Sequence, residues 1–114
     1  MNRIVFQLLF LSLTGTDICL AGSEMTGKEI FEDKCSHCHA SGTMHPGTRQ
    51  LAMTRGEDKA VLAQRKDLTA DYVRYIVRHG INAMPPFVPP DIPEQQLEEL
   101  IRYLTRDDQG QNNN

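Results

Sequence analysis

The chain has no tryptophan, only 6% aromatic residues and no excess of basic charge. Its formal net charge is −3 over 114 residues, whereas nucleic-acid-binding domains carry a basic face or stripe, so we expect no nucleic-acid partner. No apolar run approaches the roughly 20 residues that a helix needs to cross a bilayer, so we expect no membrane-spanning helix. A single domain of this size with few aromatic residues usually depends on disulfides, a metal or a cofactor for its stability.

The first residues have the layout of an export signal. Arg3 gives a positive start, residues 4–13 form an apolar run, and the small residues Ala21 and Gly22 follow. This layout is typical of a secretory signal peptide and predicts that residues 1–21 are removed on export to the periplasm. The alternative, an N-terminus that stays attached as an anchor, fits less well because Asp17 interrupts the segment.

Cysteine is also scarce, with three in the whole chain, and removal of the leader would leave Cys35 and Cys38. A disulfide between them would close a loop too short to restrict the unfolded chain appreciably. With His39 they form the pattern C-x-x-C-H, which attaches a c-type haem. Two thiols about one helical turn apart can add to the two vinyl groups on one porphyrin edge, and the next histidine can reach the iron.

Two other uses of the cysteine pair are less favoured. A redox dithiol of the thioredoxin type needs a preceding strand in a βαβ unit, and no segment alternates apolar and polar residues as a strand does. A zinc site needs about four cysteine or histidine ligands in spaced pairs, and His45 and His79 complete no such set. We therefore predict one covalent haem c, with thioethers at Cys35 and Cys38 and iron bound by His39.

The second axial ligand separates electron carriers from haems that bind gases or perform oxygen chemistry. Met84 lies far enough beyond His39 to pass around the ring, and Pro85 and Pro86 hold it in a stiff, non-helical loop. Such a loop suits a thioether that must not move when the iron changes charge, so we predict Met84 as the second ligand. Asn82 either donates a hydrogen bond to the Met84 sulfur or acts as a turn residue in this loop.

The remaining patterns are helical. A capping box at Thr26 starts one helix, and Thr69 starts another that ends at Gly80. A short helix is expected over residues 58–65. The last helix has its apolar residues three and four positions apart, at Leu97, Leu100, Ile101 and Leu104. An i,i+4 ion pair between Glu98 and Arg102 is expected on its wet side.

Together these residues resemble a class I cytochrome c. Gly27 and Phe31 match the face of the first helix that crosses the last helix in that family, and Tyr103 matches the aromatic residue of the partner helix. The resemblance implies a small all-α class I cytochrome c fold around one haem, with residues 22–114 as the monohaem domain and a polar tail over about 105–114. It also implies that the Pro46 carbonyl accepts the Nδ1 proton of the haem histidine.

A narrower resemblance rests on two stretches. Residues 45–48 (HPGT) and residues 77–87 (VRHGINAMPPF) are similar to the cytochrome subunits of 4-cresol dehydrogenase (p-cresol methylhydroxylase) and related 4-alkylphenol flavocytochromes. The resemblance implies that an FAD-containing flavoprotein dehydrogenase subunit passes single electrons to this chain, which hands them to a small soluble acceptor protein. Substrate chemistry would belong to the partner, because no nucleophile–base arrangement stands out in this chain.

Two rival functions remain at this point. The first is a free-standing periplasmic cytochrome c that serves a terminal oxidase or another reductase. The second is a haem gas sensor or haem enzyme with a labile sixth iron site, against which the proline-stiffened Met84 loop argues.

Overall fold

The computed structural model of the protein describes residues 24–105, so the predicted leader (1–21) and nearly all of the predicted polar tail lie outside the described residues. Along the chain the helices are α1 (Gly27–Lys34), α2 (Ser36–His39), α3 (Pro46–Arg55), the 3-10 helices η1 (Glu57–Lys59) and η2 (Leu62–Gln64), α4 (Ala70–His79) and α5 (Glu94–Thr105). In the described part, extended pairing is limited to one isolated bridge, between Ile81 and Met84. The predicted all-α architecture is therefore confirmed. No helix between residues 24 and 105 is long and apolar enough to cross a membrane.

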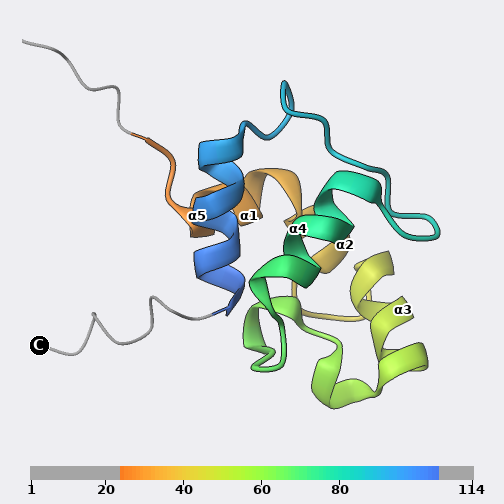
Figure 1. Ribbon diagram of the computed structural model, residues 1–114. Coiled ribbons are helices and arrows are strands. Elements are labelled where there is room, and N and C mark those ends of the chain that lie inside the picture. Colours follow the sequence, from red (N-terminus) through yellow and green to blue (C-terminus); the bar gives the residue numbers. More distant parts are fainter. Residues whose placement is uncertain (1–23, 106–114) are drawn as a thin grey trace, which may run out of the picture.

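Helices α1 and α5 cross at close range on one side of the molecule (Figure 1). Gly27 permits this approach, because a Cβ there would overlap the Glu99 carbonyl oxygen and lie 2.7 Å from Cβ of Tyr103. The Phe31 ring packs on the Tyr103 ring with 5.7 Å between centroids. The crossing expected for Gly27, Phe31 and Tyr103 is thus present.

The predicted caps of α1 and α4 are confirmed. At the start of α1, the Thr26 backbone N–H donates to the Glu29 carboxylate at 2.7 Å, and the Glu29 N–H donates to the Thr26 hydroxyl oxygen at 3.3 Å. The Thr69 hydroxyl oxygen accepts from the Tyr72 N–H at 3.3 Å. Gly80 ends α4 at φ 71°, a conformation that glycine adopts without strain.

Three local expectations differ from the structure. Helix α3 was not expected, although Pro46 stands at a helix N-terminus where its missing N–H is harmless. Residues 58–65 form the separate turns η1 and η2 in place of one helix. The expected pair between Glu98 and Arg102 is wrong: Arg102 pairs with Glu99, and Glu98 faces α4, where it bonds to Arg74 at 2.5 Å.

The core lies between α1, α4, α5 and the segments that join them. Its buried members are aliphatic apart from one phenylalanine: Ile30, Phe31, Leu68, Val73, Val77, Ile92, Leu97, Leu100, Ile101 and Leu104. Helix α3 contributes little, since Thr48 is its one buried residue. Helix α2 has no buried residue, so neither α2 nor α3 adds much to this core.

Candidate haem site

An apolar pocket opens between the helices and contains three of the residues that the sequence analysis selected. Cys35, His39 and Met84 all line it, and they come from the end of α1, from α2 and from the loop after α4. The rest of the lining is mostly apolar: Phe31, Leu51, Leu62, Leu68, Val73, Ile76, Val77, Ile81, Leu100 and Leu104. The pocket holds about 630 Å³ of space between atoms, part of it open to solvent. A flat apolar cofactor with one polar edge fits such a lining.

The C-x-x-C-H turn is a direct continuation of α1. The Cys35 N–H donates to the Phe31 carbonyl at 2.9 Å, and the His39 N–H donates to the Cys35 carbonyl at 2.9 Å. Cys35 faces the apolar interior, and burial raises the pKa of its thiol to about 12. Cys38 is exposed and is not among the residues that line the pocket.

His39 is the polar group of the pocket with the most unusual surroundings. Its Nδ1 is buried and has no hydrogen-bond partner, so the predicted bond to the Pro46 carbonyl is not made in this structure. Burial lowers the pKa of His39, which keeps the imidazole neutral at neutral pH, and neutral imidazole is the form that binds metals. A buried, unpartnered imidazole beside an apolar cavity fits a residue that serves a bound group.

The loop after His39 is braced by residues of the H-P-G-T stretch. The backbone of Gly47 lies on the imidazole: a Cβ there would be 2.6 Å from Cε1 and 2.8 Å from Nδ1 of His39. The Thr48 hydroxyl donates to the Ala40 carbonyl at 2.7 Å, and Nδ1 of His45 lies 3.0 Å from the His37 carbonyl oxygen. This stretch carries the family resemblance in the sequence, but its bracing contacts follow only from the position of α3.

Met84 is presented by a tight turn. The N–H of Ile81 donates to the Met84 carbonyl at 3.1 Å, and the Met84 N–H donates to the Ile81 carbonyl at 2.9 Å. Asn82 has φ 52°, a left-handed conformation that asparagine tolerates better than most residues. Its side chain is exposed and makes no hydrogen bond to the Met84 sulfur among the described residues, and its left-handed conformation forms the turn.

Two polar side chains of the pocket were not selected from the sequence, Arg65 and Tyr72. The Arg65 guanidinium is only 11% exposed and donates to the Asp67 carboxylate at 2.8 and 2.9 Å. These hydrogen bonds raise the pKa of Arg65 and hold that of Asp67 far below its usual range. The closely spaced arginine and aspartate suggest an ion pair, but nothing in the sequence places that pair at the pocket.

Comparison with known proteins agrees with this geometry. The family model described as "Cytochrome C oxidase, cbb3-type, subunit III" matches residues 22–104. The chain belongs to this cytochrome c family. Cytochrome c6 of Thermostichus vulcanus is 31% identical to this cytochrome over 96 residues, which are 84% of the chain and 79% of that protein. Cytochrome c6 of Alaria esculenta is 32% identical over 74% of the chain and 92% of its own length.

The narrower resemblance is also confirmed. The cytochrome c subunit of 4-cresol dehydrogenase [hydroxylating] from Pseudomonas putida is 28% identical to this cytochrome over 70% of the chain and 58% of its own length. The crystal structure of p-cresol methylhydroxylase at 2.5 Å resolution contains a similar chain, with a TM-score of 0.50 and 28% identity. That match covers 70% of this cytochrome and 90% of the other chain. As a member of the cytochrome c family, the chain is an electron-transfer protein that carries haem.

Proposed function

We propose that this cytochrome is exported to the periplasm with one covalent haem c, accepts single electrons from the FAD of a partner 4-alkylphenol dehydrogenase, and passes them to a small soluble acceptor protein. The observation that carries the proposal is the convergence of Cys35, His39 and Met84 on one apolar pocket. Its relatives, which include a cytochrome subunit of 4-cresol dehydrogenase, support the choice of partner. Bound haem supplies an iron that gains and loses one electron.

Four side chains hold the group in this proposal. Cys35 and Cys38 would form the thioethers, and His39 and Met84 would bind the iron. Burial keeps His39 neutral, and Gly47 limits the tilt of its ring. The turn at Asn82 sets the position of the Met84 side chain. These constraints would keep both side chains in place when the iron changes charge.

The ligand set is tested by the far-red sulfur-to-iron absorption band of the ferric holoprotein. We expect the band in the wild-type protein and in Met53→Ala, because Met53 is 68% exposed and lies on α3. We expect Met84→Ala to lose it while the haem stays attached. A Met84→Ala protein that keeps the band would remove Met84 from the ligand set.

The partner surface in this proposal surrounds the pocket at the Met84 turn and α2. Ala83, Pro85 and Pro86 are exposed and uncharged, which is typical of the centre of a protein interface. Ser36 and His37 lie on α2, at the start of the same attachment turn. The uncharged Met84 turn would thus form the centre of the contact with the flavoprotein.

Substitution of Ala83 tests this surface. Ala83→Asp would bury a charge in the interface, so we expect binding to the flavoprotein to weaken by at least about tenfold with an unchanged haem spectrum. Ala83→Ser is the matched control, since it adds a hydroxyl at the same place without charge. Equal binding constants for Ala83→Asp and the wild type would refute the placement.

A free-standing shuttle to a terminal oxidase or other reductase is the second candidate function, and the cytochrome c6 relatives favour it. A mild pull-down of tagged protein from its native host, followed by a visible spectrum of the eluate, separates the two. Haem together with stoichiometric flavin supports the flavocytochrome subunit. Haem without flavin supports the shuttle.

A further inference from the structure

The loop that carries Met84 has few backbone hydrogen bonds to the rest of the protein. Between α4 and α5 the chain runs without helix or strand from Gly80 to Pro93, and prolines at 85, 86, 89, 90 and 93 have no N–H to donate. Among the described residues, two backbone bonds link the part after Met84 to a helix: the Phe87 N–H donates to the Val77 carbonyl of α4 at 2.8 Å, and the Leu97 N–H of α5 donates to the Pro93 carbonyl at 2.9 Å. Besides the packing of Phe87 and Ile92 on the core, further anchoring of this part can come from donors that reach its carbonyl groups.

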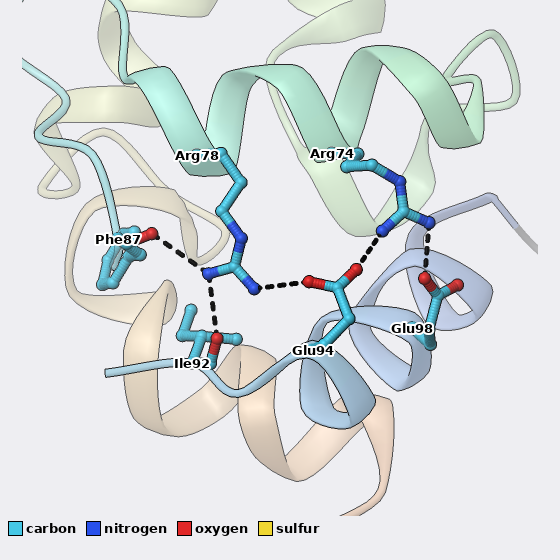
Figure 2. Close-up of polar contacts among 6 residues, drawn as sticks. All are labelled: Arg74, Arg78, Phe87, Ile92, Glu94 and Glu98. Atoms are coloured by element: carbon cyan, nitrogen blue, oxygen red, sulfur yellow. Dashed lines mark hydrogen bonds and ion pairs between the residues drawn. The ribbon is translucent and has the colours of Figure 1, made fainter. Parts of the chain in front are cut away.

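Arg78 of α4 is such a donor. Its Nη1 donates to the Phe87 carbonyl at 3.1 Å and to the Ile92 carbonyl at 2.9 Å, and its Nη2 donates to the Glu94 carboxylate at 3.0 Å. Figure 2 shows the guanidinium between these groups, which belong to the loop and to the start of α5. The Arg78 side chain is only 16% exposed, so its bonds are partly shielded from water.

Arg74, one turn earlier on α4, makes a useful contrast. It bonds to Glu94 and Glu98 at 2.5 Å each and reaches no carbonyl of the loop (Figure 2). Both arginines therefore tie α4 to α5, but Arg78 alone of the two also ties down the chain between the helices. The two contributions can be separated by experiment.

Contacts hold the chain at Met84 and directly after it. Gly80 lies close to this stretch: a Cβ there would lie 2.5 Å from the Met84 carbonyl oxygen and 2.9 Å from the Pro86 nitrogen. Phe87 then packs against the core, its N–H donates to the Val77 carbonyl, and its carbonyl accepts from Arg78. Loss of Arg78 would remove two hydrogen bonds, to the Phe87 and Ile92 carbonyls, and leave this part of the loop to its packing and the bond to Val77.

We infer that Arg78 is a positioning residue for Met84. Its guanidinium holds the Phe87 and Ile92 carbonyls, so that the Met84 sulfur stays directed at the pocket. The inference rests on the proposed role of Met84 as an axial ligand. A charged, planar donor with several N–H groups suits this task, because it can serve three acceptors at once. A lysine keeps the charge but lacks the planar fork, so it replaces this function only in part.

The test is a titration of the ferric holoprotein with imidazole, which displaces Met84 from the iron. Loss of the far-red sulfur-to-iron band measures this displacement. In Arg78→Met the loop opens more readily, so we expect half-displacement at about tenfold lower imidazole concentration than in the wild type. Arg78→Lys should fall between them. Arg74→Met, which removes two ion pairs but no loop contact, should stay within about twofold of the wild type.

Each other outcome contradicts the inference. An unchanged midpoint in Arg78→Met, or equal shifts in Arg74→Met and Arg78→Met, would show that the loop contacts do not hold Met84. Absence of the band from the wild-type holoprotein, or its persistence in Met84→Ala, would instead overturn the ligand set and the inference with it. The band is therefore recorded first, in the wild type and in Met84→Ala.

Discussion

His39 lies against a glycine backbone, and its buried Nδ1 has no hydrogen-bond partner. Gly47 has no Cβ, and only for that reason can its backbone lie against the imidazole. The Nδ1 atom is buried without a partner, so ring orientation depends on packing in this structure. The α3 backbone therefore constrains the ring of His39, the proposed iron ligand, by steric contact.

Gly47→Ala tests this contact. The new methyl group would lie 2.6 Å from Cε1 of His39 and 2.7 Å from the Cys38 carbonyl oxygen, so the ring or α3 must shift. We expect a loss of about 1–3 kcal/mol in the free energy of unfolding and a changed visible spectrum of the holoprotein. Gln50→Ala, at an exposed position of the same helix, is the control and should leave both unchanged. Wild-type behaviour of Gly47→Ala in both measurements would show that the imidazole does not need this space.

Between helices, α4 and α5 are joined by an ion-pair network as well as by packing. Glu94 is its centre, because Arg74 and Arg78 both bond to it. Hydrogen bonding to Arg78, with the charge of Arg74, lowers the pKa of Glu94 below the ordinary 4.5. A carboxylate with a lowered folded pKa stabilises the fold above its ordinary pKa, and this contribution is lost as the pH falls through the lowered value.

Glu94→Gln tests the network through its pH dependence. Above about pH 6 we expect the variant to unfold at a lower denaturant concentration than the wild type, because the charged partner of both arginines is gone. As the pH falls through the lowered pKa of Glu94, the wild-type carboxylate becomes protonated, so the two midpoints should converge. Denaturant unfolding of both proteins across this pH range measures the gap between their midpoints. A gap that stays constant with pH would mean that the charge of Glu94 does not contribute.

Local signals predicted three helices correctly, and tertiary context explains the errors. Helices α1, α4 and α5 have caps or regular apolar faces that can be recognised from neighbouring residues. Helix α3 buries a single residue, so it has no apolar stripe to reveal it. Glu98 pairs with Arg74 of another helix, a choice that spacing along α5 does not encode.

In the candidate site, too, the residues within local motifs were predicted and the contacts between distant residues were not. Cys35, His39 and Met84 were predicted because their motifs are local, and the structure places them around one pocket. The contacts that orient them join residues far apart in sequence, such as Arg78 with Ile92. Such contacts require the path of the chain in space, which no short motif specifies.

Across the described part of the chain, the pocket is continuous with the hydrophobic core. The apolar lining of the pocket includes core residues from α1, α4 and α5, so a bound haem would extend the hydrophobic core across the molecule. Ligands that bind only the folded state stabilise it, and covalent attachment keeps the ligand in place. Haem would thus contribute to folding as well as to electron transfer.

The double variant Cys35→Ala/Cys38→Ala, prepared without haem, tests this dependence. We expect its denaturant midpoint to lie well below that of the holoprotein and its far-ultraviolet circular dichroism to show less helix, because the pocket lining is left exposed to water. Met53→Ala, prepared with haem, controls for loss of an exposed apolar side chain. A haem-free double variant as stable and as helical as the holoprotein would show that the protein core suffices.

The most direct measurement is the visible spectrum of the ferrous holoprotein before and after addition of carbon monoxide at neutral pH. If His39 and Met84 bind the iron in both oxidation states, the protein is an electron carrier and its ferrous spectrum should stay unchanged. Met84→Ala should bind carbon monoxide readily and serves as the positive control. Tight binding by the wild-type protein would contradict the electron-carrier function and indicate a haem with an open or labile sixth site.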